Sequence, residues 1–319
     1  MTGDGVTTAR KDAGAPRHAQ RREQPTRHRF AGSTDRAAPL TSPLGATLSE
    51  MGMTDTPALT VPALVPDRAL AAGFSNRPIG THTGKTMMLA ELRLLLAAAP
   101  GVVSFADYQR AAVEENALAK STAANRANTL MYLKQLYGLR PDIPVFAAMR
   151  ELWEVRRDDQ PLLALLCGSA RDVLLRTSAE VVLGAEFGAP VLAADLSGAI
   201  GGAFPHRYSP ASLRNLGQNI ASSWTQAGLL TGARDKRRVT PSVDLAAVVY
   251  ALYLGHLEGY AGPALFTARW AGMLDRDEAE LRVLVEAAAR NGWLEYRSSG
   301  GMTEITFRHL DDVTAWTRP

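Results

Sequence analysis

An almost unbroken apolar stretch runs from Pro161 to Leu175 and restricts the fold more than any other feature of the chain. Proline is a favourable first residue of a helix, and leucine, alanine and valine occupy nearly every side of the helix that this stretch predicts. Such a helix is stable in water only when other elements cover it all round. Because 46% of the 319 residues are hydrophobic, the chain can supply that cover, and we expect this helix at the centre of a helical body.

Helical periodicity extends over most of the chain from Thr86 onward. Apolar residues recur there at positions three and four apart, as they do on the buried face of a helix. Small polar residues that cap helices precede these repeats at Ser104, Ser121 and Ser209, and Gly138 follows one of them as a stop. The pattern predicts a bundle of helices.

The last part of the chain combines helices with strands. A short helix is followed by a longer one, whose predicted start is Asp275 with Glu278 and whose end is Gly292. Alternating residues then predict strands over 293–297 and 303–308, joined by a tight turn. Helix, helix and hairpin in this order are typical of a winged helix. The predicted fold is mainly α, a helical bundle with winged-helix-like (helix-turn-helix) units and a short C-terminal β-hairpin wing.

Composition divides the chain into three parts. Residues 1–78 hold eight of the 18 prolines and too little apolar surface to offset the entropy of ordering, so we expect a disordered tail. Residues 79–183 are expected to form an N-terminal helical domain, and residues 184–319 a C-terminal helical and winged-helix domain. Residues 1–50 contain eight Lys and Arg against five Asp and Glu, which accounts for the net charge of +3. Met53 is an alternative start of translation that would omit this basic tail.

A segment that ends in Gly84-Lys85-Thr86 resembles part of a phosphate-binding loop. That loop has four residues between its two glycines, but only three separate Gly80 from Gly84. No buried strand is predicted before the segment, and no strand ending in aspartate follows it to hold Mg²⁺. The segment therefore predicts a polar helix start, and the sequence argues against nucleotide hydrolysis.

Residues that bind metals or attack substrates show no functional spacing. The six histidines are scattered, and the single cysteine, Cys167, lies in the most apolar helix, where packing is its expected role. We therefore expect a non-enzymatic protein with no metal and no cofactor. A single cysteine fits a reducing compartment, and no apolar run reaches the roughly 20 residues that span a bilayer. We expect a cytoplasmic protein with no membrane partner.

Two segments offer basic and neutral polar side chains on acid-free helices, a composition that suits nucleic acid. The first runs from Asn116 to Pro141, and the second is the helix from Ser209 with the basic loop 234–238 after it. Arg and Lys bind phosphates, and Asn and Gln bind phosphates or base edges; a merely solvated face is the alternative. The candidate DNA-binding residues are Lys120, Asn125, Arg126, Lys134, Arg214, Asn215, Gln218, Arg234, Lys236, Arg237 and Arg238.

The C-terminal unit is less suited to DNA. Its predicted recognition helix, 276–290, contains three arginines, Arg282 among them, against four acidic residues. Phosphates would be repelled by this net negative charge. A role in docking another protein suits this unit better.

Several stretches resemble the BrxA-like family, accessory proteins of bacteriophage-exclusion (BREX) defence systems. These stretches are 116–126, 133–139, Leu162–Leu166 with Arg171-Asp172, and 222–229, so that the resemblance spans roughly residues 85–310. The resemblance implies an all-helical body with winged-helix-like parts that binds DNA and acts beside other BREX components. It assigns no roles in the C-terminal winged unit or the tail.

These features predict an accessory protein of phage defence that binds double-stranded DNA, mainly through phosphates and with low sequence selectivity. Two other functions remain open. One is a scaffold that docks subunits of a defence complex, and the other is a winged-helix transcriptional regulator. In each case the apolar helix expected at Leu245–Leu257 suits a homodimer interface.

Overall fold

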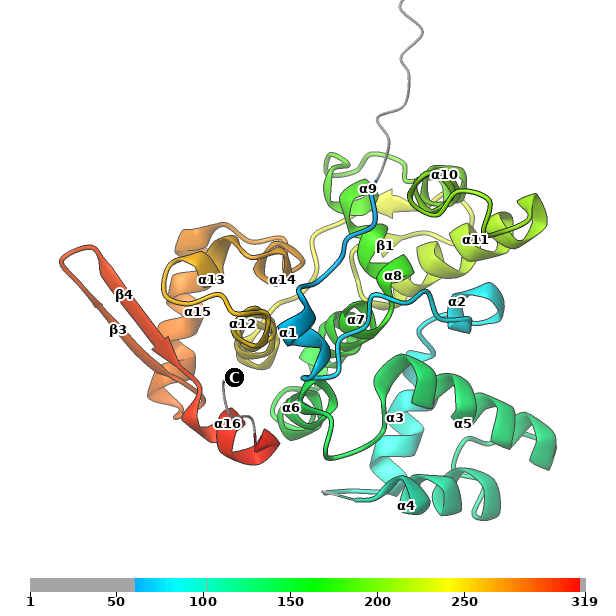
Figure 1. The fold of residues 1–319 in the computed structure, drawn as a ribbon, viewed down its shortest axis with the longest axis horizontal. Helices are drawn as coiled ribbons and strands as arrows, with labels where there is room; N and C mark the ends of the chain where they lie inside the picture. Colours follow the sequence, from blue (N-terminus) through cyan, green and yellow to red (C-terminus); the bar gives the residue numbers. More distant parts are fainter. Residues whose placement is uncertain (1–60, 102, 316–319) are drawn as a thin grey trace, which may run out of the picture. The chain divides into compact units, whose positions relative to one another are not determined.

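The computed structural model describes residues 61–101 and 103–315, which are mainly helical (Figure 1). They belong to one compact unit, Thr56–Pro319. Two short antiparallel hairpins supply the strands of this described part. No helix within it is long and apolar enough to cross a membrane. The mainly α fold class is confirmed.

The helices and strands follow one another in the order seen in Figure 1. The first half contains α1 (Asp67–Leu70), α2 (Thr81–Gly84), α3 (Leu89–Ala98), α4 (Phe105–Gln109), the π-helical turn η1 (Arg110–Glu114), α5 (Ala123–Tyr137), α6 (Pro144–Leu152), the 3-10 turn η2 (Arg157–Asp159), α7 (Gln160–Arg171), α8 (Val173–Thr177) and α9 (Ala179–Leu183). The second half contains α10 (Ala193–Ala203), α11 (Pro210–Gln226), β1 (Leu230–Thr231), β2 (Arg237–Arg238), α12 (Leu245–Glu258), α13 (Ala264–Thr267), α14 (Arg269–Gly272), α15 (Glu278–Arg290), β3 (Glu295–Ser299), β4 (Met302–Thr306) and α16 (Arg308–Thr314).

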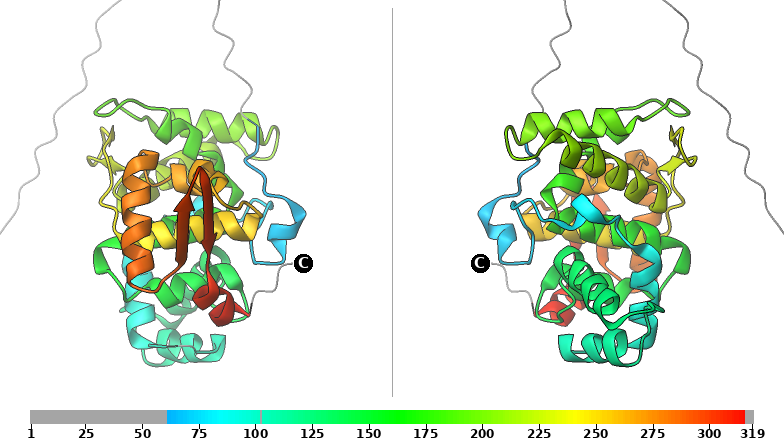
Figure 2. Two further views of the ribbon diagram at one scale, coloured as in Figure 1. Left: turned by 90° about the vertical axis from the view of Figure 1, so that its left-hand side faces the viewer. Right: turned by 90° about the vertical axis from the view of Figure 1, so that its right-hand side faces the viewer.

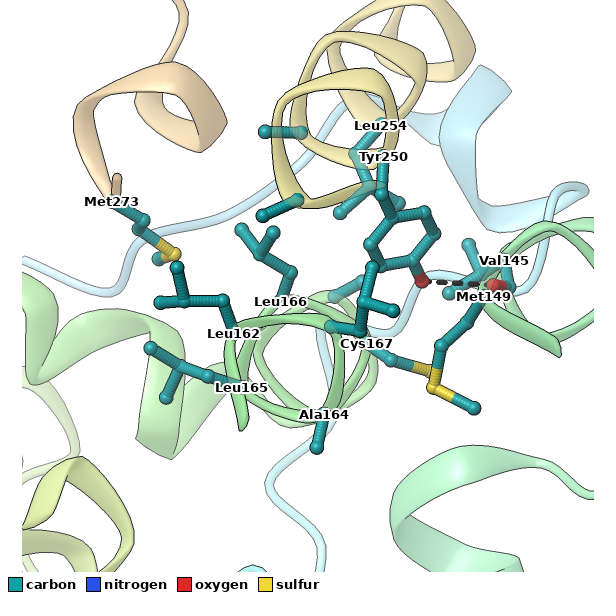
Figure 3. Close-up of a cluster of buried hydrophobic side chains, with 14 of the residues drawn as sticks. Val145, Met149, Leu162, Ala164, Leu165, Leu166, Cys167, Tyr250, Leu254 and Met273 are labelled. Carbon is teal, nitrogen blue, oxygen red and sulfur yellow. Dashed lines mark hydrogen bonds between the residues drawn. The ribbon is translucent and has the colours of Figure 1, made fainter. Parts of the chain in front are cut away.

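Helix α7 lies at the centre of the unit, as its apolar sequence predicts. The single helix expected from Pro161 to Leu175 is divided at Asp172, whose extended backbone ends α7 and whose side chain caps α8. No residue from Leu162 to Cys167 exposes more than 1% of its surface, because α5, α6, α8, α11 and α12 all pack against this helix. Figure 3 shows Leu166 and Cys167 of α7 facing Tyr250 of α12. Full burial of each leucine stabilises the fold by about 1.5–3 kcal/mol relative to an exposed one.

Helix α12 is the second helix of the core. Each residue from Leu245 to Leu254 is at most 8% exposed, and Tyr250 donates its hydroxyl proton to the carbonyl oxygen of Val145 at 2.8 Å (Figure 3). The carboxylate of Asp159 accepts the backbone N–H of Ala247 at 3.0 Å and so satisfies a free donor at the helix start. Since the chain itself covers this helix, the prediction that it forms a dimer interface is wrong.

Local capping explains where several helices begin and end. Ser104 and Asp107 form a reciprocal capping box at the start of α4. Thr122, and not the expected Ser121, caps α5 by accepting a backbone N–H of its first turn at 3.2 Å. Gly138 ends α5 as expected, with a positive φ of 93° that glycine adopts at little cost.

The C-terminal hairpin is confirmed, with small shifts of its bounds. β3 pairs antiparallel with β4, and Ser299 lies opposite Met302 across the turn. β4 ends at Thr306, and α16 begins at Arg308, the predicted last residue of the second strand. Phe307 and Leu310 are both fully buried, and their spacing of three suits a helix and not a strand, whose side chains alternate. The capping box of α15 also lies further along the chain, at Asp277 with Glu280.

Residues 61–78 correct the predicted extent of disorder. The segment contains α1, and Val65, Ala69 and Phe74 are at most 4% exposed. The ring of Phe74 packs edge-on against Trp270 with 5.4 Å between centroids. The Arg68 Nε donates to the carbonyl oxygen at the end of α12. This segment is therefore part of the core, while the predictions on residues 1–60, including the start at Met53, lie outside the described residues.

The expected division at 183/184 crosses dense packing. α11 packs on α2 and α7, and α12 packs on α6 and α7, so elements of both expected domains share the core. The Asp159 carboxylate that supports the start of α12 comes from the first of these expected domains. The packed part of the chain is best described as one body.

A truncation tests the role of residues 61–78. We expect a chain that begins at Ile79 to melt at least about 10 °C below a chain that begins at Met53, since loss of a buried phenylalanine alone costs about 3–5 kcal/mol. Differential scanning fluorimetry measures both. Phe74→Ala in the longer chain should account for part of the loss, and equal melting temperatures of the two chains would contradict the assignment of this segment to the core.

Candidate nucleic-acid interface

The helices α10 and α11 pack so closely that backbone and side chains touch between them. A Cβ atom at Gly217 would lie 2.2 Å from the carbonyl oxygen of Ala193, so only glycine fits at this position. The Ser197 hydroxyl lies 2.8 Å from the carbonyl oxygens of Ala193 and Leu213 and donates to one of them. Helix α10 therefore fixes the orientation of α11.

Helix α11 has one buried and one exposed face. Its buried face contains Leu216, Ile220 and Trp224. On the opposite side Arg214, Asn215 and Gln218 are exposed, and their spacing of three and four places them together. The structure thus gathers the three predicted site residues of this helix on one polar, acid-free surface.

The hairpin after α11 pairs with a third extended segment. β1 and β2 are antiparallel, and residues 188–191, which precede α10, run along the other edge of β2. Gly188 N donates to Arg238 O and Val191 N to Lys236 O, both at 2.9 Å. The chain therefore runs through helices, an extended segment, α10, α11 and a hairpin, and the extended parts lie in the order 188–191, β2, β1.

The predicted basic residues of this hairpin differ in exposure. Arg234 and Arg237 are exposed, and Arg237 Nη1 also donates to the carbonyl oxygen of Gly188 at 2.9 Å. Lys236 is half-buried, and its Nζ donates to the Thr225 hydroxyl at 3.0 Å. Burial lowers the pKa of Lys236. Two of these cations are thus accessible to a ligand, and the third is largely engaged.

Arg238 faces the interior. It is 3% exposed, and its Nη2 lies 2.8 Å from the carboxylate of Asp275. Successive residues of a strand point to opposite faces, so the exposure of Arg237 requires the burial of its neighbour. The prediction that Arg238 binds DNA is therefore wrong. Through its ion pair with Asp275, the residue instead connects the hairpin to the segment that precedes α15.

The predicted cations near α5 already have partners. Lys120 Nζ lies 2.9 Å from the carboxylate of Glu91. Burial raises the pKa of Glu91, but the hydrogen bond and charge of Lys120 outweigh it, so the net shift is downward. Lys134 Nζ lies 3.9 Å from the ring centroid of Phe105, a cation–π contact. Both ammonium groups would have to leave these partners to bind DNA.

The other two candidates of α5 are more open. Asn125 is exposed and Arg126 is half-buried, with an Nε that has no hydrogen-bond partner among the described residues. Helix α2 packs against both α5 and α11, and in Figure 1 and the right-hand view of Figure 2 it lies between them. The helices α5 and α11 thus lie on the same side of the molecule, with α2 between them.

The turn between α10 and α11 adds a cation that is not among the candidates predicted from the sequence. His206 and Arg207 are exposed there, and Arg207 Nε donates to the adjacent Tyr208 hydroxyl at 3.3 Å. The signal was present in the sequence, because no Asp or Glu occurs between Asp195 and Asp235. The acid-free surface is therefore larger than the helix alone.

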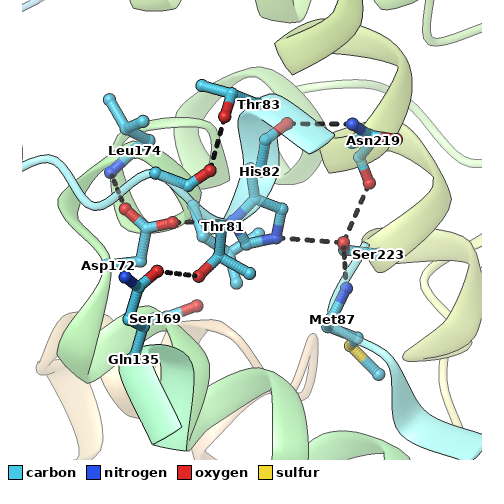
Figure 4. Close-up of polar contacts among 12 residues, drawn as sticks. Thr81, His82, Thr83, Met87, Gln135, Ser169, Asp172, Leu174, Asn219 and Ser223 are labelled. Carbon is cyan, nitrogen blue, oxygen red and sulfur yellow. Dashed lines mark hydrogen bonds and ion pairs between the residues drawn. The ribbon is translucent and has the colours of Figure 1, made fainter. Parts of the chain in front are cut away.

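A buried polar cluster joins α2, α8 and α11 in the order of hydrogen bonds known from Ser-His-Asp triads (Figure 4). His82 Nδ1 lies 2.6 Å from the carboxylate of Asp172, and its Nε2 lies 3.1 Å from the hydroxyl of Ser223. That hydroxyl also accepts Met87 N at 2.9 Å and lies 2.9 Å from the carbonyl oxygen of Asn219. The serine oxygen is thus surrounded by partners.

Burial gives this cluster a structural role. The side chains of His82, Asp172 and Ser223 are all 0% exposed, so no substrate reaches the hydroxyl. His82 belongs to the segment that resembles a phosphate-binding loop. In the described residues this segment forms α2, and no strand precedes it as one would in a phosphate-binding loop. His82 O also accepts Asn219 Nδ2 at 2.9 Å. The cluster attaches α2 to α11 and thereby fixes the position of the exposed α11 face.

Within residues 61–101 and 103–315, no three His, Cys, Asp or Glu side chains are placed to hold a metal ion. No protein-family model matches the chain, and no curated protein matches it. Function is therefore inferred from the exposed face of α11 and the hairpin beside it.

The buried cluster can be tested by stability. Asp172→Asn should destabilise the fold by about 1–3 kcal/mol, because it replaces with a donor one of the two carboxylate oxygens that face His82 Nδ1 and Leu174 N and so leaves a buried donor unsatisfied. Ser223→Ala should cost about 1–3 kcal/mol, and the matched control Ser222→Ala, on the half-exposed side of α11, should cost little. Urea denaturation measures all three. Labelling of Ser223 by a serine-directed fluorophosphonate would contradict the structural role.

The thiol of Cys167 gives a second test of burial. Desolvation raises its pKa to about 12, so the reactive thiolate is scarce at neutral pH. We expect the native protein to react negligibly with Ellman's reagent and to release one equivalent of thiol in denaturant. Rapid reaction of the folded protein would contradict the placement of Cys167 beside Tyr250.

Proposed function

We propose that residues 173–238 form a winged helix that binds double-stranded DNA, with α11 in the major groove and the β1–β2 hairpin on the backbone. The observation that carries this proposal is the acid-free exposed face of α11 beside a hairpin with two accessible arginines. Helix, extended segment, helix, helix and hairpin is the chain order of a winged helix. The second helix of a helix-turn-helix enters the major groove, and α11 occupies that position.

The exposed residues have the chemistry that this role needs. Arg214 offers a planar fork of donors to a phosphate or a guanine edge. Asn215 and Gln218 can donate and accept at an adenine edge or bind phosphates. Arg234 and Arg237 of the hairpin are exposed cations for phosphates. Because most of these contacts are with phosphates, we expect low sequence selectivity.

The surface of α5 is a secondary contact in this proposal. Helix α5, which carries Asn125 and Arg126, lies on the same side of the molecule as α11 (Figures 1 and 2). Lys120 and Lys134 contribute only if DNA displaces Glu91 and Phe105 from them. The C-terminal unit lies outside the contact, since Arg282 is held by the carboxylate of Glu278 at 2.6 Å.

The wider role follows from the resemblance of the sequence to the BrxA-like family. On that basis the protein is a cytoplasmic, non-enzymatic accessory factor of a BREX-type phage-defence system, and it needs no cofactor. Its partners are DNA and other components of the same system. Methyltransferase, ATPase and phosphatase-like genes beside its own gene would support this role, whereas their absence would favour a transcriptional regulator.

A scaffold function is the second candidate. Phe187 is 77% exposed and Leu192 is 54% exposed, on either side of the extended segment that pairs with β2. In this alternative the two apolar side chains would be part of the contact with another protein. If the protein bound defence subunits but did not bind DNA, this alternative would be favoured.

Salt dependence of binding tests the proposal. If Arg207, Arg214, Arg234 and Arg237 each neutralise one phosphate, the slope of log affinity against log salt is about −4, at about −0.9 per contact. Fluorescence anisotropy with duplexes of unrelated sequence measures it. Combining Arg214→Ala with Arg237→Ala should weaken binding to all duplexes and make the slope shallower by about two units.

Two matched controls separate a local from a general charge effect. Arg140→Ala removes an exposed arginine paired with Asp142, and Arg282→Ala removes one from α15; both should leave the affinity and slope nearly unchanged. Loss of binding in the Arg282 variant, with the α11 and hairpin variants unaffected, would place the DNA surface on the C-terminal unit. Absence of binding at low salt would favour the scaffold.

A further inference from the structure

A cavity of about 280 Å³ opens beside α6, away from α10, α11 and the hairpin. Pro100, Gly101 and Val103, which precede α4, line it together with residues of the helices α6 and α16. Its walls are mainly apolar, with Val103, Phe146, Ala147 and Val313 among them. A volume of this size approaches the lower end of small-molecule sites, about 300 Å³.

One charged group, Arg150 of α6, is buried at this cavity. The residue lines the cavity and is 8% exposed. Its Nη1 lies 3.5 Å from a carboxylate oxygen of Glu154, and its Nε has no hydrogen-bond partner among the described residues. Burial raises the pKa of Tyr108, and the charge and hydrogen bond of Arg150 partly offset that rise. The guanidinium therefore lies close to the phenol inside the protein.

Two other arginines of the described residues are equally buried, and both are well satisfied. Arg176 Nη1 donates to the carbonyl oxygen of Ser169 at 2.6 Å, and its other nitrogens also meet backbone oxygens. Arg238 is paired with Asp275 at 2.8 Å. Buried charges normally have such partners, because an uncompensated one is costly. Arg150 is less well satisfied, since its contact with the Glu154 carboxylate is long, at 3.5 Å, and its Nε has no partner among the described residues, and it lies at a cavity.

We propose that this cavity binds a small organic monocarboxylate, whose carboxylate pairs with Arg150 and whose apolar body lies against Phe146, Ala147 and Val313. Arginine and carboxylate match in charge and in planar geometry. The Nε atom is screened from solvent, so the ligand meets the terminal nitrogens of the guanidinium. Burial of an aliphatic or aromatic body against the apolar walls removes apolar surface from water and so favours binding.

Acidic residues at the cavity favour a single negative charge on the ligand. Glu151 and Glu154 both line it, and Glu151 is paired with His309 at 2.9 Å. The side chain of Glu154 is 68% exposed and only distantly bonded to Arg150. A dianionic phosphate would be repelled by these carboxylates, whereas a monocarboxylate takes the place of Glu154 on the guanidinium. Glu154 is thus a competitor of the ligand.

Isothermal titration of the full chain with hexanoate tests the proposal, with 1-hexanol as the uncharged match. We expect hexanoate to bind and hexanol to bind at least about tenfold more weakly, since a charge-assisted bond of about 1.5 kcal/mol or more is lost. Glu154→Gln should tighten hexanoate binding several-fold, and Arg150→Gln should weaken it at least about tenfold. The exposed Arg140→Gln should leave it unchanged.

The variants also cover the case in which Arg150→Gln fails to fold. Val313→Phe narrows the cavity from a half-exposed position and should abolish binding, while Glu154→Gln changes an exposed side chain. Equal affinities for hexanoate and hexanol would overturn the proposal. It would be overturned equally by a Glu154→Gln variant that binds hexanoate no more tightly than the native protein, or by absence of binding to the native protein.

Discussion

The burial of α7 and α12 is the constraint on which the rest of the structure depends. Neither helix has a solvent face, because α5, α6, α8 and α11 cover α7, while α1, α6, α13, α14 and α15 cover α12. Segments far apart in the chain meet on this pair, from Phe74 near the start of the described part to Trp270 in α14. The same requirement explains why the described residues form one body and why α12 is not available to a second copy of the chain.

Polar contacts then set what the outer helices present to solvent. The cluster of His82, Asp172 and Ser223 attaches α2 to α11 and α8, while Gly217 lets α10 approach α11 closely. Together they leave one face of α11 in solvent with Arg214 and its polar neighbours. The exposed surface proposed to bind DNA is therefore fixed by buried groups that never touch it.

Much of the helical fold was predictable from the sequence, because apolar periodicity and caps such as Ser104 and Gly138 are local signals. The burial of Arg238 was not, since it depends on the pairing of a two-residue strand with β1 and with residues 188–190, and on the ion pair with Asp275. The sequence likewise predicted Lys120 to be a free cation. Its partner Glu91 lies 29 residues earlier, on α3, so their ion pair depends on the tertiary fold. Sequence identified residue types suited to DNA, whereas exposure depended on tertiary contacts. The triad-like cluster was missed because its three members are far apart in the chain.

The central claim is that the exposed face of α11 lies against DNA, and site-specific photocrosslinking tests it most directly. A benzophenone amino acid replaces Gln218 on α11 in one variant and Val283, 65% exposed on α15, in another. Both are irradiated with labelled duplex at low salt. The account predicts a protein–DNA adduct from position 218 and little or none from position 283. An adduct from position 283 with none from position 218 would contradict it.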